Sequence, residues 1–194
     1  SGEAKELFSK EELIEKFSIE RVHKAGAKFD FEKAKWYNHE WIKHSAAETL
    51  FPQVKALFEK ENIAVQHDDL LLKIISLVKD RCVLMNDFIM QGSYFFQKPA
   101  SIDTEAVKPK WNEEKQLFFQ ELSNVLDAIT VWDAVNIETA FKELALIKNI
   151  KVGELQLPFR VMLVGGKYGP AVFQIAEIIG KDETIQRCND FKLS

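Results

Sequence analysis

Apolar residues recur every three or four positions over most of the chain, and this spacing predicts helices. The clearest example runs from Asp69 to near Gly92, where the pattern predicts one long amphipathic helix. No stretch keeps the alternation typical of a strand, and no internal repeat is visible, so we expect an all-α protein. The apolar stripe of the long helix consists of Leu71, Ile74, Ile75, Val78, Cys82, Met85 and Ile89.

Local signals mark where several helices begin. Ser9 and Glu12 have the spacing of a capping box, and Asp30 is well placed to cap the segment that follows it. Pro158 and Pro170 each precede an apolar run, which favours a helix starting at each proline. Residues 97–110 contain two prolines and no periodicity, which is typical of a linker. We therefore expect two consecutive helical bundles, residues 45–100 and 101–194, preceded by a short segment, residues 1–44.

Composition narrows the classes of function. The net charge of −4 and the pI of about 5.7 argue against bulk binding to DNA or RNA, although a local basic face remains compatible with them. No apolar run has the length of a membrane helix, and the N-terminus lacks the apolar core of a signal peptide. Two distant cysteines favour neither a disulfide framework nor zinc, so we expect a cytoplasmic protein. The opening Ser1-Gly2 is typical of a processing or cloning scar and suggests a fragment of a longer protein.

A glycine-rich stretch, "LVGGKYGPAVF" from Leu163 to Phe173, first suggests a phosphate-binding loop. The phosphate motif requires its lysine after the second glycine, but Lys167 lies between the glycines, and Pro170 lacks an amide N–H. Two interpretations stay open. One is a simple turn between helices, with Pro170 at the first helical position; the other is a helix N-terminus whose free amides face RNA.

No sequence pattern points to a catalytic or metal site. "HEWIKH" resembles a zinc-protease motif, but His39 and His44 are five residues apart and point about 140° away from each other on a helix. We therefore expect no bound metal and no catalytic residue in this chain.

The segment from Arg21 to Lys43 is locally basic and rich in aromatic residues. It has six lysines or arginines against three acidic residues, and Trp36, Tyr37 and Trp41 lie among them. Such a mixture suits an RNA backbone and exposed bases. The alternative is that Trp36 and Trp41 are core residues beneath a charged surface. The basic residues are Arg21, Lys24, Lys28, Lys33, Lys35 and Lys43, and the acidic ones are Asp30, Glu32 and Glu40.

Two blocks together carry a resemblance to a known family. "FSIERVHKAGAKFDFEKAKWYNHEWIK" resembles the region after the catalytic domain in bacterial glutamyl-tRNA synthetases, and "LPFRVMLVGGKYGPAVFQIAEIIGK" resembles their C-terminal signature. The resemblance covers nearly the whole chain from about Phe8. It implies two helical subdomains that form an anticodon-binding cage, preceded by a segment that contacts the tRNA stem.

The resemblance also implies roles for individual residues. Arg81 matches an arginine that faces the first anticodon base and helps to separate glutamate from glutamine tRNAs, and Arg160 matches one near the third base. Gly169 stands where some members have threonine, which removes a possible hydrogen bond to a base, and Lys43 replaces an arginine of some members. The pocket for the second and third bases is matched by Gly169, Pro170, Val172 and Phe173, and the stem contacts by Lys33, Trp36 and Lys43.

The family's catalytic signatures, HIGH and KLSKR, do not occur in this chain. We therefore expect no cofactor here and no activation of glutamate by the fragment alone; the parent enzyme would use ATP and Mg2+ to charge tRNA(Glu). The expected partners are tRNA(Glu) and the catalytic domain of the same parent chain, with no membrane and no DNA. Two alternatives stay open: a helical protein-interaction module without an RNA role, and an enzyme whose site assembles from scattered residues.

Overall fold

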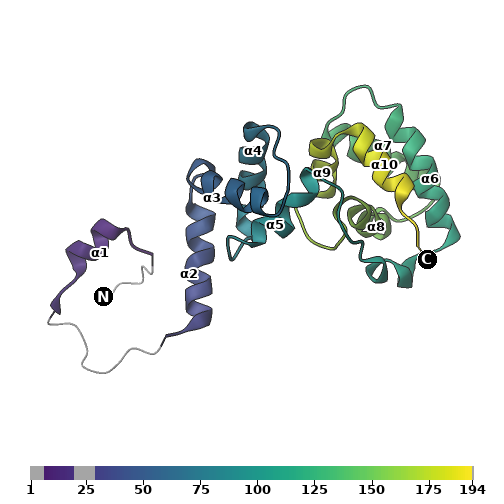
Figure 1. Ribbon diagram of the computed structural model, residues 1–194. Helices are drawn as coiled ribbons and strands as arrows, with labels where there is room; N and C mark the ends of the chain where they lie inside the picture. The colour runs from purple at the N-terminus through teal and green to yellow at the C-terminus, as the bar shows by residue number, and fades with distance from the viewer. Residues whose placement is uncertain (1–6, 20–28, 194) are drawn as a thin grey trace.

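The computed structural model describes residues 7–19 and 29–193 (Figure 1). Every regular element in these residues is a helix, which confirms the all-α prediction. None of these helices is both long and apolar enough to span a bilayer. The longer elements are α1 (Lys10–Lys16), α2 (Phe31–His44), α3 (Ala47–Lys60), α4 (Asp68–Val78), α5 (Asp87–Gly92), α6 (Glu113–Asp127), α7 (Ala134–Ile147), α8 (Val152–Val164), α9 (Val172–Ile179) and α10 (Lys181–Asp190).

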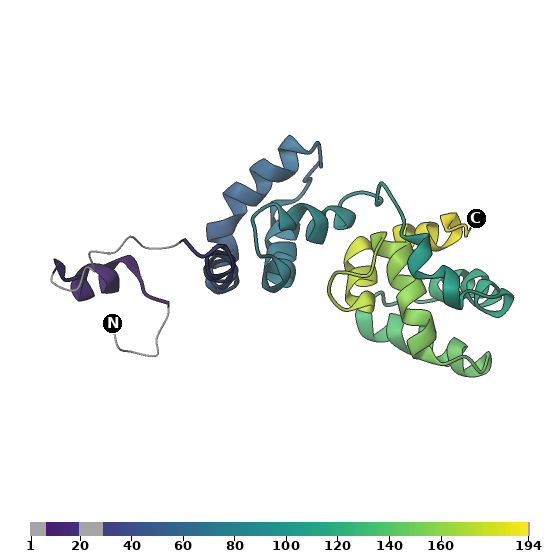
Figure 2. The same cartoon turned by 90° about the horizontal axis from the view of Figure 1, so that it is seen from below.

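The helices form two groups. Figures 1 and 2 both show α2–α5 as one bundle and α6–α10 as a second bundle beside it. Short 3₁₀ turns lie between the longer helices: η2 (Lys79–Arg81) and η3 (Ser93–Phe95) in the first bundle, and η4 (Thr104–Ala106) and η5 (Lys108–Lys110) before α6. The cores of the two bundles join into one hydrophobic cluster, because η3 packs against α9.

The capping signals proved reliable at two helix starts. At α1, the Glu12 amide donates to Ser9 Oγ at 3.1 Å, and the Ser9 amide donates to Glu12 Oε2 at 2.8 Å. At α2, Asp30 Oδ1 accepts from the amides of Glu32 and Lys33, each at 3.0 Å. These bonds satisfy amides that a helix start otherwise leaves unpaired, so the sequence correctly located both starts.

The long helix predicted over residues 69–92 is wrong, because the chain breaks in its middle. After η2, Asp87 Oδ2 accepts from the amides of Val83 and Leu84, at 2.7 and 2.8 Å. The Cys82 carbonyl faces His39 Nδ1 of α2 at 2.9 Å. These partners replace the bonds that a continuous helix would have formed here. The apolar stripe still packs inward, but on two helices joined by an irregular turn.

The two proline predictions also need correction. Pro158 lies inside α8 instead of at its start, and it is buried. Pro170 lies two residues before the first residue of α9, which is Val172, and Ala171 is the N-cap. The apolar segments were identified correctly, but the prolines did not mark their first residues.

Candidate nucleic-acid interface

Arg81 is the last residue of η2, and its position follows from the break in the predicted long helix. Since α4 ends at Val78, the chain turns just before Arg81, and the next residue, Cys82, is extended and fully buried. The side chain of Arg81 is exposed. The turn thus anchors the backbone through Cys82 and leaves a guanidinium at the surface of the first bundle.

Arg160 comes from α8 in the second bundle and holds the glycine-rich turn in place. Its Nη1 donates to the carbonyls of Tyr168 at 3.1 Å and Pro170 at 2.6 Å. Burial lowers the pKa of Arg160; the charge of Arg81 acts in the same direction, and Tyr94 acts against it. Arg160 therefore shapes the turn directly, while its half-buried guanidinium keeps other donors for a ligand.

Tyr94 of η3 is the residue on which the charges of both arginines act. Burial raises the pKa of Tyr94, and the positive charges of Arg160 and Arg81 oppose this shift. The packing agrees with this, because α5 contacts both η2, which carries Arg81, and η3, which in turn contacts α9 of the second bundle. The two arginines that the sequence proposed separately thus both act on Tyr94, one from each bundle, at the seam between the bundles.

The turn itself requires glycine at two positions. Gly165 ends α8 with φ of 83°, and Gly169 has φ of 98°, both in the left-handed region. A Cβ on Gly169 would lie 2.7 Å from Tyr94 Oη. The absence of a side chain therefore lets the turn close onto Tyr94 and brings α9 to the seam.

The start of α9 combines buried side chains with backbone amides that no side chain caps. Val172 and Phe173 are 4% and 5% exposed, and the Phe173 ring lies 5.3 Å from that of Phe141. Pro170 is buried as well. Together these residues fix the direction of the helix start. Contact with a ligand through them stays a prediction, and the exposed Ala171 is the part of this segment that faces solvent.

The second predicted surface is on α2. Trp36 and Trp41 are 40% and 47% exposed, so the alternative that buried them in the core is wrong. Trp36 and Lys43 are seven residues apart and project within about 20° of each other on the helix, with Lys33 nearby on the same face. Lys33 Nζ lies 5.6 Å from the centre of the Tyr37 ring. The three predicted stem-contact residues thus share one face; Arg21, Lys24 and Lys28 lie outside the described residues.

The histidines of "HEWIKH" make separate structural contacts. His39 faces the Cys82 carbonyl, whereas His44 Nδ1 lies 2.8 Å from the Glu40 carbonyl. Among the described residues, no group of three or more potential ligands is placed to hold a metal ion.

Sequence reasoning did not identify Tyr94. The only signal was the aromatic run "YFF" at Tyr94–Phe96, which equally suits an ordinary core. The predicted residues do not line the surface pocket of about 440 Å³ between α6 and α10. The seam is recognisable from its charges and its glycine turn instead of from its depth.

Comparisons with known proteins agree on one family. A family model described as "Anticodon binding domain" matches residues 32–191. A glutamate–tRNA ligase of Flavobacterium johnsoniae is 41% identical over 186 residues, which are 96% of this chain and 37% of that protein. One from Pelodictyon phaeoclathratiforme is 34% identical and is covered to 39%.

The structural comparison gives the same result. A crystal structure of a glutamate tRNA ligase from Elizabethkingia meningosepticum, in complex with its amino acid, superposes with a TM-score of 0.85 at 37% identity. The match covers 95% of this chain and 36% of that one. The chain thus spans little more than a third of the length of the relatives it matches.

Proposed function

The chain belongs to the anticodon-binding domain family and corresponds to that region of glutamate–tRNA ligases, and from this premise we propose that it binds tRNA(Glu) and reads its anticodon. The observation that carries the proposal is the glycine turn that Arg160 holds against Tyr94 of the first bundle, the residue on which the charge of Arg81 also acts. Guanidinium groups suit the hydrogen-bonding edges of unstacked bases, and single-stranded loops expose those edges.

Each part of the seam has a distinct role in this proposal. Arg81, being exposed, donates to the edge of one base, while Arg160 and the uncapped amides at the start of α9 face the neighbouring bases and phosphates. Gly169, Pro170, Val172 and Phe173 shape the pocket. The seam recognises RNA by local geometry, since a chain of net charge −4 gains little from bulk attraction to phosphate.

The α2 face supplies the second contact. Lys33 and Lys43 neutralise phosphates of the tRNA stem, and Trp36 packs against a sugar or base between them. The proposed division is therefore a stem-contact segment in residues 1–44 and two anticodon-binding subdomains in residues 45–100 and 101–194. No observation favours the alternative of a protein-interaction module.

For the parent enzyme we propose the attachment of glutamate to tRNA(Glu) with ATP and Mg2+ in the cytoplasm. The residues of this chain take no part in that chemistry. They hold the anticodon, and thereby the tRNA, in a fixed position relative to the catalytic domain of the same parent chain.

The test compares tRNA(Glu) binding by the chain and by single charge-removing variants. Arg81→Ala is the sharpest, because the Arg81 side chain is exposed and forms no hydrogen bond or ion pair within the described part of the chain. Loss of one bidentate base contact is worth about 1–3 kcal/mol, so the dissociation constant rises about tenfold. The matched control is Lys142→Ala on α7, which removes one exposed charge outside the proposed interface.

The control is expected to change the dissociation constant less than twofold. Equal effects of Arg81→Ala and Lys142→Ala would contradict the proposal, because binding would then depend on overall charge alone. For the α2 face, a Lys33→Ala/Lys43→Ala variant is expected to weaken the binding of every tRNA. The number of counterions released on binding, measured from the salt dependence of the affinity, should fall by about one to two.

A further inference from the structure

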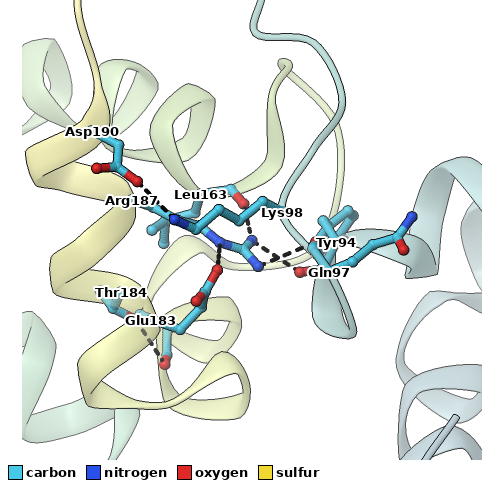
Figure 3. Close-up of polar contacts among 9 residues, drawn as sticks. Tyr94, Gln97, Lys98, Leu163, Glu183, Thr184, Arg187 and Asp190 are labelled. Atoms are coloured by element: carbon cyan, nitrogen blue, oxygen red, sulfur yellow. Dashed lines mark hydrogen bonds and ion pairs between the residues drawn. The ribbon is translucent and has the colours of Figure 1, made fainter. Parts of the chain in front are cut away.

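Arg187 of α10 is a buried arginine whose hydrogen bonds join the two bundles (Figure 3). Its Nη1 donates to the carbonyl of Tyr94 at 2.9 Å and also to the carbonyl of Leu163. Its Nη2 donates to the Gln97 carbonyl at 3.2 Å. One nitrogen of the side chain thus bridges the end of the first bundle and the α8 helix of the second.

The guanidinium charge is also paired. Nε donates to Glu183 Oε1 at 2.7 Å, one helical turn earlier on α10, and the Arg187 side chain is only 3% exposed. A buried cation is tolerated where its charge and its N–H groups have partners. Loss of the guanidinium would leave the carbonyls that it now binds without a hydrogen-bond donor. The position of the guanidinium is therefore closely fixed by α10, and its partners are fixed by the guanidinium.

These partners are the segments that carry the proposed anticodon contacts. Arg81 ends η2, which is connected to Tyr94 through α5, because α5 packs against both η2 and η3. Arg160 lies on α8 one turn before Leu163. Holding the Tyr94 carbonyl against the Leu163 carbonyl therefore sets the separation of the two arginines. We propose that Arg187 is a positioning residue that prearranges the seam for RNA, an inference that rests on the proposed function.

A positioning role for Arg187 affects RNA binding in a way that a purely structural role would not. While the bundles are held together, an RNA loop bound to Arg81 finds Arg160 already in place, and the second contact costs little further ordering. When the bundles move independently, each contact must be made separately. The benefit of Arg81 for binding should therefore depend on Arg187.

A matched control crosses the same seam. Lys98 Nζ lies 2.7 Å from Asp190 Oδ2, and the two side chains are 43% and 57% exposed (Figure 3). An exposed pair of this kind contributes little, because water screens it. Lys98→Ala thus removes a cation and a cross-bundle contact but leaves the hydrogen bonds of the buried Arg187 in place.

The experiment is a double-mutant cycle with Arg187→Lys, which keeps the charge but not the planar fork. Binding of a tRNA(Glu) anticodon hairpin is measured for the full chain, Arg81→Ala, Arg187→Lys and the double variant, after circular dichroism confirms folding. We expect Arg187→Lys to weaken binding at least fivefold and to reduce the penalty of Arg81→Ala at least threefold. Lys98→Ala should leave that penalty unchanged. If Arg187→Lys does not fold, Glu183→Gln takes its place, since it weakens the ion pair and keeps the guanidinium.

A second readout needs no RNA. Spin labels at the exposed residues Ser76 and Thr139, with Cys82 and Cys188 replaced by alanine, report the distance between the bundles. A narrow distribution of the label-to-label distance in the otherwise unmodified chain, which broadens in Arg187→Lys, supports the positioning role of Arg187. An unchanged distribution, or an unchanged Arg81→Ala penalty, overturns it. Failure of the unmodified chain to bind the hairpin would instead overturn the proposed function.

Discussion

Replacing Gly165 by alanine should test the seam from the side of the glycine turn. Its φ of 83° is strained for any residue with a Cβ, at a cost of about 1–2 kcal/mol. The new Cβ would also lie 2.4 Å from the Ser101 carbonyl oxygen and 2.8 Å from Pro99 Cβ, and overpacking of this kind costs about 1–3 kcal/mol. Gly165→Ala should therefore lower the free energy of unfolding by about 2–5 kcal/mol.

Two other glycines separate strain from collision. Gly180 has φ of 90° and ψ of 164°, a region that glycine occupies almost alone, but open space around it, so Gly180→Ala should lower the free energy of unfolding by the strain alone, about 1–3 kcal/mol. Gly153 lies inside α8 without a positive φ, and a Cβ added to it would meet nothing within 4 Å. Gly153→Ala should therefore raise the free energy of unfolding by about 0.5–1 kcal/mol.

Urea unfolding followed by circular dichroism measures all three. The expected order of stability is Gly153→Ala, the unmodified chain, Gly180→Ala and then Gly165→Ala. If Gly165→Ala were no less stable than Gly180→Ala, the linker at residues 99–101 would not press against the turn, and the packing described for the seam would be wrong.

Three further predictions concern single side chains. Lys115 hydrogen-bonds Glu154 and lowers the pKa of the Glu154 carboxyl. The pair therefore stabilises the fold above the unfolded pKa of about 4.5, and this contribution is lost as the pH falls through the lower pKa of the folded state. Lys115→Met should raise the Glu154 pKa in an NMR titration. Burial raises the pKa of Cys82 and Cys188 to about 12, so neither thiol should react with a disulfide reagent at pH 8 until denaturant is added. Tyr94 Oη has no hydrogen-bond partner among the described residues, so Tyr94→Phe should raise the free energy of unfolding by about 1 kcal/mol, and a marked loss would contradict this assignment.

What the sequence predicted well was local. The caps at Ser9 and Asp30 satisfy amides within three residues, and the helix faces follow from a period that any amphipathic helix shares. These features depend on neighbours along the chain, so the sequence contains the whole interaction.

What it missed depends on distant partners. The break after η2 is stabilised partly by His39 from another helix, and the periodicity of residues 69–92 gives no sign of it. No sequence pattern singled out Arg187; the one available signal was Glu183 four residues earlier, a spacing that more often marks an exposed pair. Its burial follows from packing against segments that are far apart from it in the sequence, since Tyr94 lies 93 residues earlier.

The candidate site was predicted mainly through the family resemblance. Residue patterns alone left the glycine stretch open between a simple turn and an RNA-facing helix start. The fold adds that the charges of Arg81 and Arg160 both act on Tyr94 and that Trp36 is exposed. It also assigns Val172 and Phe173 to the core, so their contribution to an anticodon pocket would come from its shape.

The most direct test of the central claim is the affinity of this chain for tRNA(Glu) against the same tRNA with its three anticodon bases replaced. The two RNAs carry the same backbone charge, so bulk attraction contributes equally to both. We expect the altered tRNA to bind at least tenfold more weakly, with most of that difference lost in Arg81→Ala. Equal affinities for the two RNAs would show that the seam does not read the anticodon and would contradict the account.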